Sequence, residues 1–252
     1  MVQQDTRFSR IELMLGSEAC EKLRKASVAV VGLGAVGSYA VEGLARAGVS
    51  RLRLVDFDSV CPSNINRQLY ALESTIGRLK IDVAKERVLD INPSCQVETV
   101  HGFIDAETVW EFIGEYPDIV IDAIDGLNPK VDLLEAVRMK EVPVISCLGA
   151  AMRSDATSVR VAPLSKVHHC PLGRVVRQRL RRRGVPVDFD CVYSEELLPN
   201  PLPVRMPVDA PGEEQVLSRG RVRNILGSLP TITGIFGLTA ANAAIQHIIK
   251  KQ

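Results

Sequence analysis

Aromatic residues are scarce in this chain, which has 6 Phe, 4 Tyr and 1 Trp among 252 residues. Base stacking on aromatic side chains is therefore an unfavoured way for it to bind nucleic acid. The 6 cysteines include no pair at the C-x-x-C spacing, which excludes a cysteine-based zinc site and a redox dithiol, and we expect no resident metal site. The polar N-terminus has no apolar leader, so we expect a cytoplasmic protein with reduced thiols.

Long apolar runs are also lacking, apart from residues 232–249. Asn242 and Gln246 interrupt that run, and its many glycines and alanines favour close helix packing. We interpret it as a buried or dimer-interface helix, with a membrane span as the less favoured alternative.

Net charge is nearly absent, because 31 basic and 30 acidic residues leave +1. The balance is a cancellation between two unlike halves. Residues 1–150 carry 16 basic and 22 acidic side chains, a net of −6, while residues 151–252 carry 15 and 8, a net of +7. This asymmetry predicts a division of labour along the chain.

The order of apolar patterns predicts an α/β protein. After a helix expected over residues 9–25, short β-branched runs alternate with helical patterns as far as residue 146. Such alternation is typical of a Rossmann-like, doubly wound, mainly parallel sheet. We expect an N-terminal helical arm (1–26), a nucleotide-binding domain (27–150), and a C-terminal extension (151–252) that adds antiparallel strands and helices to the same sheet.

A glycine-rich turn follows the first expected strand. Gly32, Gly34 and Gly37 form G-x-G-x-x-G, in which the first glycine permits a tight turn, the second lets backbone approach a phosphate, and the third allows close helix packing. Asp56 ends the next strand, where a carboxylate can accept hydrogen bonds from ribose hydroxyls. The pattern predicts a nucleotide site, and a turn that only packs is the less favoured interpretation.

The residues after Asp56 favour a triphosphate over a dinucleotide. Asp58, Asn64 and Arg67 lie in D-F-D-S-V-C-P-S-N-I-N-R-Q, and Lys80 begins the next expected helix. Arg67 and Lys80 can stabilise charge on a leaving pyrophosphate, Asn64 can orient a ribose or phosphate, and Asp58 can help to hold Mg²⁺. An ordinary solvated loop is the alternative.

With these motifs the chain resembles the ThiF/MoeB/HesA superfamily, whose members adenylate a carboxylate with ATP. The resemblance covers residues 7 to about 165 and implies ATP contacts from a set of residues at matching positions: Gly34, Asp56, Asn64, Arg67, Lys80 and Asp125. Asp125 is expected at the end of the fourth strand, followed by Gly126 where relatives often have Asn or Ser. The R-F-S-R opening implies that Arg10 reaches the ATP of a second subunit, and hence a homodimer.

Two further motifs resemble the tRNA threonylcarbamoyladenosine dehydratase branch of that superfamily. They are H-C-P-L-G-R-V-V-R, beginning at His169, and D-C-V-Y-S-E-E, beginning at Asp190. The resemblance implies adenylation of the threonyl carboxylate of a modified adenosine in tRNA, followed by ring closure with loss of AMP. Because that closure is intramolecular, no protein nucleophile is required, and we expect Cys61 and Cys147 to be structural.

Arginine is concentrated near the start of the extension. The expected tRNA-binding residues are Arg174, Arg177, Arg181, Arg182 and Arg183, with Arg219, Arg221 and Arg223 as further candidates. Cations on one face of an amphipathic helix suit a polyanion. A solvated charge run is the alternative.

Two other functions stay open at this point. The same ATP site would serve adenylation of the C-terminal carboxylate of a small sulfur-carrier protein, and a sulfur-relay protein is a partner that the resemblance leaves open. An NAD-binding oxidoreductase or redox module would account for the glycines and Asp56, but it leaves Arg67, Lys80 and Asp125 without a role.

Overall fold

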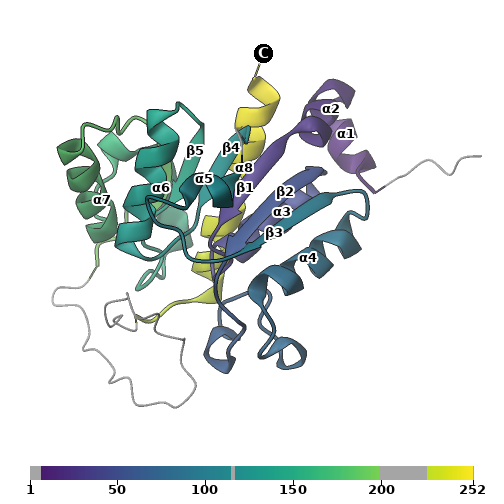
Figure 1. Cartoon of the computed structure of the whole chain (residues 1–252), viewed down its shortest axis with the longest axis horizontal. Coiled ribbons are helices and arrows are strands. Elements are labelled where there is room, and N and C mark those ends of the chain that lie inside the picture. Colours follow the sequence, from purple (N-terminus) through teal and green to yellow (C-terminus); the bar gives the residue numbers. More distant parts are fainter. Residues whose placement is uncertain (1–6, 115–116, 199–225, 252) are drawn as a thin grey trace, which may run out of the picture.

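A seven-stranded sheet runs through the centre of the protein, with helices on both faces (Figure 1). The computed structural model describes residues 7–114, 117–198 and 226–251. The strand order is β3-β2-β1-β4-β5-β7-β6. The bounds are β1 Ser27–Val31, β2 Arg51–Asp56, β3 Gln96–His101, β4 Ile119–Asp122, β5 Val144–Cys147, β6 Val159–Pro163 and β7 Asp190–Ser194.

The sheet is mainly parallel. Strand β1 pairs in parallel with both β2 and β4, and β3, β5 and β7 continue the parallel run on the two sides. Strand β6 pairs antiparallel with β7. The predicted Rossmann-like fold is confirmed, and the residues after 150 extend the same sheet by β7 and the antiparallel edge strand β6.

Alternate residues of the central strand face two different cores. Val28 and Val30 of β1 belong to one buried cluster, while Ala29 and Val31 belong to the other. A strand buried on both faces has an almost continuous apolar sequence, as β1 does. Side chains alternate between the two faces of a strand, so an apolar strand such as β1 needs helices on both faces. That is the doubly wound arrangement.

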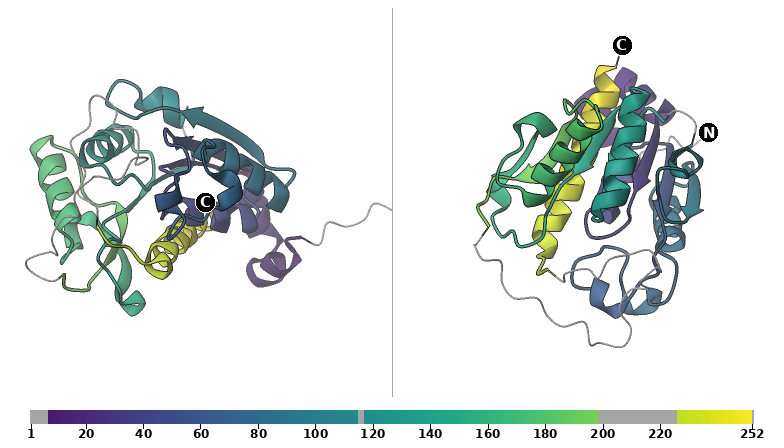
Figure 2. Two further views of the ribbon diagram at one scale, coloured as in Figure 1. Left: turned by 90° about the horizontal axis from the view of Figure 1, so that it is seen from below. Right: turned by 60° about the vertical axis from the view of Figure 1, so that its left-hand side comes forward.

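Two groups of helices pack against the two faces of the sheet. The two groups can be told apart in the left view of Figure 2, seen from below. Residues of α3, α4 and α8 pack in the first cluster, and residues of α5, α6 and α7 pack in the second. The bounds are α3 Gly37–Arg46, α4 Lys80–Ile91, α5 Val109–Ile113, α6 Leu127–Met139, α7 Pro171–Arg182 and α8 Pro230–Lys250.

The leading helix is broken in two. Where one helix is expected over residues 9–25, the structure has α1 (Ser9–Leu15) and α2 (Ser17–Lys25). Gly16 separates them with a φ of 83°, a left-handed conformation that glycine adopts readily. The hydrophobic pattern continues through the break, so the sequence periodicity did not reveal it.

Helix α8 packs closely on α3, as its small residues predict. A Cβ atom added to Gly237 would lie 2.2 Å from the Val36 carbonyl oxygen, and one added to Gly43 would lie 2.8 Å from the Ala241 Cβ. Within the described residues α8 is the one helix long and apolar enough to cross a membrane, and half of that apolar window is buried inside the protein. The expected Pro-rich stretch at 199–211 and Arg219, Arg221 and Arg223 lie outside the described residues.

Candidate functional site

The predicted nucleotide residues gather at the carboxyl edge of the sheet, where the strand order reverses between β1 and β4. The glycine-rich turn follows β1, Asp56 is the last residue of β2, and the loop with Asp125 follows β4. In open α/β sheets this crevice is where ligands bind, because the loops on either side leave in opposite directions.

The three positions of the turn are occupied by glycine for different reasons. Gly32 has a φ of 88°, and a Cβ there would lie 2.8 Å from the Ala123 carbonyl oxygen, while a Cβ at Gly37 would lie 1.7 Å from the Gly32 carbonyl oxygen. These two positions are closed to side chains by the fold itself. A Cβ at Gly34 would meet nothing nearer than Gln68 Nε2 at 3.8 Å. The protein therefore leaves space at Gly34, which suits the close approach of a phosphate.

This difference predicts opposite outcomes for two alanine substitutions. We expect Gly34→Ala to leave the unfolding free energy unchanged or raise it by up to about 1 kcal/mol, and to weaken ATP binding about tenfold through the added methyl group. Gly37→Ala is expected to cost more than about 3 kcal/mol because the backbone must move. Urea denaturation and ATP titration measure both, and unchanged ATP affinity in folded Gly34→Ala would contradict the assignment.

Asp56 joins the second strand to the glycine turn. Its carboxylate is buried and accepts hydrogen bonds from the backbone N–H groups of Leu33, at 2.6 Å, and Asp58, at 2.8 Å. Burial raises the pKa of Asp56 above its usual value, although the charge of Lys80 and the two backbone donors act against the rise. A carboxylate has about four lone-pair directions, so this one can still accept from ribose hydroxyls.

Lys80 and Asp58 form a partly buried ion pair, and the charge of Lys80 acts on the neighbouring Asp56. Lys80 begins α4 with 2% of its surface exposed, and its Nζ lies 2.8 Å from Asp58 Oδ2. The Lys80 backbone N–H also donates to the Asp58 carbonyl at 3.0 Å. The loop of residues 57–79 therefore folds back on itself and places an ammonium group at the crevice, as the sequence predicts.

Asn64 has an amide group that the protein leaves without a partner. It ends the short 3-10 helix Pro62–Asn64, is 1% exposed, and accepts from the Cys61 N–H through Oδ1 at 3.2 Å. Its buried Nδ2 has no hydrogen-bond partner in the described part of the chain. A buried donor of this kind is rare in native proteins and fits a ligand oxygen.

Arg67 is half-buried and is held within its own loop. Its Nη1 donates to the Ser63 carbonyl at 2.8 Å and to Asn66 Oδ1 at 3.1 Å. The guanidinium must therefore leave these contacts, or keep them with other nitrogens, in order to bind a phosphate. Gln68, which was not among the site residues expected from the sequence, is buried next to Gly34. The sequence signal that could have identified Gln68 is its position directly after Arg67 in N-I-N-R-Q.

Two predicted residues, Asp125 and Arg10, are exposed. Strand β4 ends at Asp122, so Asp125 does not end the strand as expected; it is exposed in the loop before α6. Arg10 is exposed on α1. Phe8, the residue just before α1, packs on Gly48 near the start of β2. This is the opposite edge of the sheet from the crevice (Figure 1). One chain does not bring Arg10 to its own site.

A buried polar cluster that the sequence motifs do not predict lies beneath the β4 and β5 ends. Lys130 Nζ lies 2.6 Å from Asp122 Oδ2 and donates to the Cys147 carbonyl at 2.9 Å, and Ser146 Oγ donates to Asp122 Oδ2 at 2.6 Å. The side chains of Lys130, Asp122 and Ser146 are fully buried. The cluster connects the first turn of α6 to β4 and β5 at the carboxyl ends of these strands, next to the crevice.

The thiols of Cys61 and Cys147 have no feature of a nucleophile. Burial raises the pKa of Cys147 to about 12, with the charge of Lys130 opposing the rise, and Cys61 Sγ donates to the Ser59 carbonyl at 3.8 Å. No cluster of three or more His, Cys, Asp or Glu side chains suited to a metal occurs in the described ranges. Carboxylates near the crevice, such as Asp58, suit Mg²⁺ held largely through nucleotide phosphates.

The arginines of α7 divide into two kinds. Arg177 Nη1 donates to the Leu164 and Val167 carbonyls at 3.0 and 2.7 Å, Arg179 donates to Asn128 Oδ1 at 2.6 Å, and Arg183 pairs with Asp132 at 2.8 Å and with Glu135. These three cross-link α7 to its surroundings. Arg177 and Arg183, two of the residues that the sequence predicts to bind tRNA, thus also make contacts within the chain.

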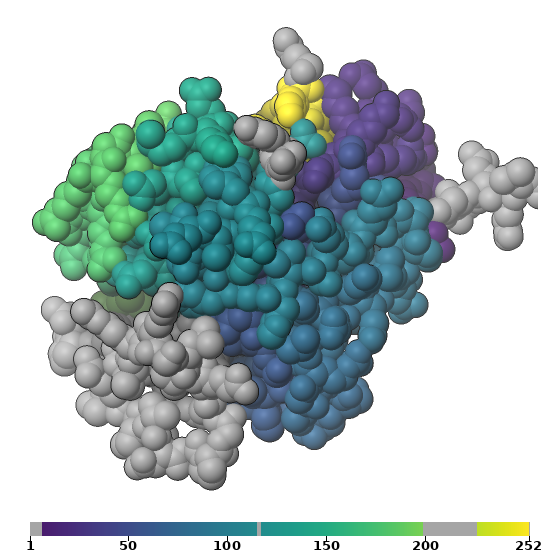
Figure 3. All heavy atoms as spheres, in the orientation of Figure 1, coloured from purple at the N-terminus to yellow at the C-terminus, as the bar shows by residue number. Residues whose placement is uncertain are grey.

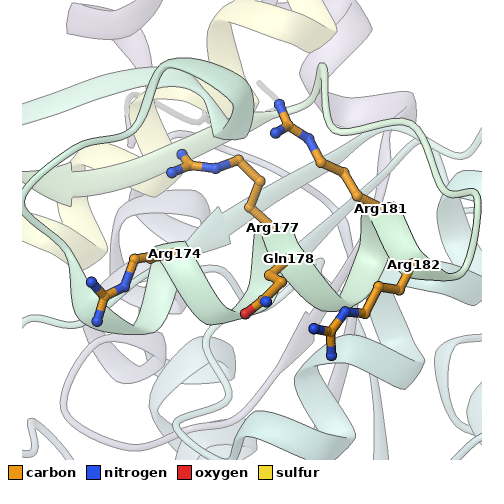
Figure 4. A pocket seen from close by; sticks show the side chains of 5 residues that line it. All are labelled: Arg174, Arg177, Gln178, Arg181 and Arg182. Carbon is orange, nitrogen blue, oxygen red and sulfur yellow. The ribbon is translucent and has the colours of Figure 1, made fainter.

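The other arginines of α7 are exposed and form a basic groove. Arg174, Arg181 and Arg182 have no hydrogen bond or ion pair within the described residues, and they line the groove together with Arg177 and Gln178 (Figure 4). Helix α7, whose residues line the groove, lies on the flank of the molecule away from α1 and α2 (Figure 1), and Figure 3 shows the same separation by colour. It is thus a separate surface from the nucleotide crevice.

The fold and the crevice define a nucleotide-binding protein of the Rossmann-like α/β class. The ThiF family model matches residues 8–252, and the chain belongs to the ThiF family. A Bacillus subtilis tRNA threonylcarbamoyladenosine dehydratase is 44% identical over 75% of this chain and 74% of its own length, and the Haemophilus influenzae dehydratase is 34% identical over 98% and 95%.

A solved structure agrees with the sequence relatives. The Escherichia coli tRNA N6-threonylcarbamoyladenosine dehydratase in complex with ATP superposes with a TM-score of 0.84 at 30% identity, covering 98% of this chain and 96% of that one. The family and branch predicted from the motifs are confirmed.

Proposed function

We propose that this chain is an ATP-dependent tRNA threonylcarbamoyladenosine dehydratase of the cytoplasm. The observation that carries the proposal is that the open glycine Gly34, the buried Asp56, the buried Lys80 and the unpartnered amide of Asn64 all lie at or after the carboxyl ends of β1 and β2. This set fits a nucleoside triphosphate. The proposed substrate class is that of the relatives similar in sequence to this chain.

The proposed reaction has two steps. The threonyl carboxylate attacks the α-phosphate of ATP and expels pyrophosphate, which gives an acyl-adenylate. A ureido atom of the same nucleoside then attacks the acyl carbon and expels AMP, so that the nucleoside loses one water in total. The second step is intramolecular, so proximity supplies much of its acceleration.

Each crevice residue has a proposed role. Asp56 and Asn64 bind and orient the nucleoside and phosphates, and Lys80 and Arg67 stabilise charge on the departing pyrophosphate. Mg²⁺, when bound with the triphosphate, neutralises phosphate charge, and Asp58 and Asp125 are its proposed carboxylate partners. Gly32, Gly34 and Gly37 keep backbone close to the phosphates.

Arg10 is proposed to complete the site of a second copy. Because α1 lies at the opposite edge of the sheet from the crevice, only another subunit can bring Arg10 to a given ATP. A homodimer in which each subunit supplies Arg10 to its partner satisfies this geometry. Mixing Arg10→Ala chains with Lys80→Met chains tests it, because a mixed dimer would regain one intact site.

The experiment that tests the function combines the protein with modified tRNA, ATP and Mg²⁺, followed by mild digestion to nucleosides. We expect a nucleoside lighter by one water and one AMP released per product. An unchanged nucleoside mass, or pyrophosphate exchange stimulated by a Gly-Gly-ended carrier protein and not by tRNA, would overturn the proposal. Co-purification with a sulfur-relay protein would test that further partner.

The exposed arginines of α7 are proposed to bind tRNA phosphates. Arg181→Glu with Arg182→Glu should weaken tRNA binding and reduce the slope of log affinity against log salt by about 1 for each phosphate that is no longer bound. ATP affinity should stay unchanged because the groove lies outside the crevice. The matched control is Arg24→Glu with Lys25→Glu on α2, at the far end of the molecule (Figure 3). Equally weakened tRNA binding in both variants would contradict a specific surface.

A further inference from the structure

Arg153 is a buried arginine that the proposed mechanism does not use. It lies in the loop between β5 and β6 with 2% of its surface exposed. Its Nη2 donates to the His169 carbonyl at 2.7 Å, while its buried Nε and Nη1 have no hydrogen-bond partner among the residues that the structure describes. A buried guanidinium with two of its three nitrogens unpartnered in the described residues is unfavourable, which makes Arg153 a candidate for binding a ligand.

The neighbouring carboxylate of Glu196 is engaged by other groups. Glu196 accepts hydrogen bonds from the Ser154 N–H, the Ser154 hydroxyl and the Asp155 N–H, each at 2.9 Å. Although burial alone would raise it, the pKa of Glu196 is lowered by these hydrogen bonds and, to a smaller extent, by the charge of Arg153. Arg153 therefore acts on Glu196 only through its charge, and Glu196 does not accept from the unpartnered Nε and Nη1 of Arg153 in the described structure.

The backbone on both sides of the Arg153–His169 hydrogen bond is held in an uncommon conformation. Met152, just before Arg153, has a φ of 61°, and His169, whose carbonyl accepts from Arg153, has a φ of 53°. The Met152 N–H donates to the Gly227 carbonyl at 2.8 Å, which fixes that side of the loop. Non-glycine residues in the left-handed region are disfavoured and concentrate at ligand sites, where surrounding contacts hold them.

The position of Arg153 suits an anion that approaches the crevice. Its loop leaves the carboxyl end of β5, the edge that also carries the glycine turn. Asp56 places the ribose over β2, so an acceptor must come from the β4 and β5 side. His169 lies next to Cys170, the residue before the N-terminus of α7, where the helix dipole also favours negative charge. Arg174, in the first turn of α7, adds a further exposed cation.

We propose that Arg153 binds an oxyanion of the bound tRNA, either the carboxylate of the modified nucleoside or a backbone phosphate near it. The inference rests on the proposed function and names the residue that recognises the acidic group of the substrate. Nε and Nη1 of Arg153 are buried in the free chain, so the surrounding loop must shift to let the anion reach them. If the anion is the carboxylate, Arg153 binds the charged acid and releases it once that acid becomes a neutral acyl-adenylate.

The test compares two tRNAs of identical sequence, one carrying the threonylcarbamoyl group and one unmodified transcript. Binding of each is measured for the wild-type protein and for Arg153→Met. If Arg153 binds the carboxylate, the substitution lowers affinity for the modified tRNA about 10- to 100-fold and leaves the unmodified tRNA unaffected. It also raises KM more than it lowers kcat, because the interaction belongs to the ground state. If Arg153 binds a phosphate, both tRNAs bind more weakly by the same factor.

Unchanged affinity for both tRNAs in a folded Arg153→Met protein would overturn the inference. Arg138→Met is the matched control, because Arg138 also has a buried Nε without a partner in the described residues but pairs with Asp188 at 2.7 Å away from the crevice. If Arg153→Met does not fold, Arg153→Gln keeps a donor for the His169 carbonyl without the charge and is judged by the same criteria. Dehydration by the wild-type protein is measured first, so that failure of the proposed function and failure of this inference are told apart.

Discussion

Replacing Lys80 with methionine is expected to lower kcat/KM for ATP-dependent dehydration by about 10²- to 10³-fold, the usual reduction when one preorganised charge-stabilising group is removed. Lys80 is buried and its Nζ is oriented by Asp58 at 2.8 Å, so we expect it to bind the phosphates with little loss of side-chain entropy. Methionine keeps most of the packing of the side chain. Pyrophosphate release with modified tRNA is the measurement.

Two control variants separate charge stabilisation from structural damage. Lys85→Met lies on the same helix but outside the crevice, and it should keep nearly the full rate. Asp58→Asn retains Lys80 and removes the charge of Asp58, which is both its ion-pair partner and a proposed Mg²⁺ ligand, and a smaller reduction is expected because Asp125 and the phosphates still hold Mg²⁺. A Lys80→Met protein with nearly wild-type pyrophosphate release would contradict the role of Lys80, and thermal melting confirms that each variant is folded.

Replacing Lys130 with methionine is expected to destabilise the fold by about 3–5 kcal/mol, because it leaves the Asp122 carboxylate buried without its partner. Both side chains have no exposed surface, and Nζ lies 2.6 Å from Oδ2. The free energy of unfolding from urea denaturation measures the effect.

The double variant Lys130→Met with Asp122→Asn provides the matched comparison. Removing both charges avoids an isolated buried ion, so a substantial part of the stability should return. The hydroxyl of Ser146 can still hydrogen-bond to the asparagine side chain that replaces Asp122. A double variant as unstable as Lys130→Met would show that packing, and not the uncompensated charge, accounts for the destabilisation.

The crevice could be predicted from the sequence because its residues are tied to strand ends. Gly32 and Asp56 each follow a short apolar run, and parallel strands bring such positions to one edge. Lys80 could be placed because it begins a helix. Asp125 was misplaced by three residues, since I-D-A-I-D continues the strand pattern beyond the point where the Asp122 side chain turns to bind Lys130.

Interactions between distant segments could not be predicted in this way. The six arginines near α7 look alike in sequence, yet Arg177 is held by carbonyls of residues 164 and 167 while Arg181 remains exposed. Only the packing of α7 on its neighbours separates these roles. The same holds for Arg153, whose burial depends on the fold around it, as does the lack of partners for its Nε and Nη1 among the described residues.

The packing of α8 on α3 also has a consequence for biosynthesis. Val28 and Val30 of β1 and the inner side of α3 belong to one core with Phe236 and Ala240 of α8, about 200 residues later in the chain. On the ribosome, the N-terminal half therefore emerges long before the helix that covers it. A chain that stops before Pro230 would leave this apolar face uncovered, and we expect it to aggregate more readily than the full chain.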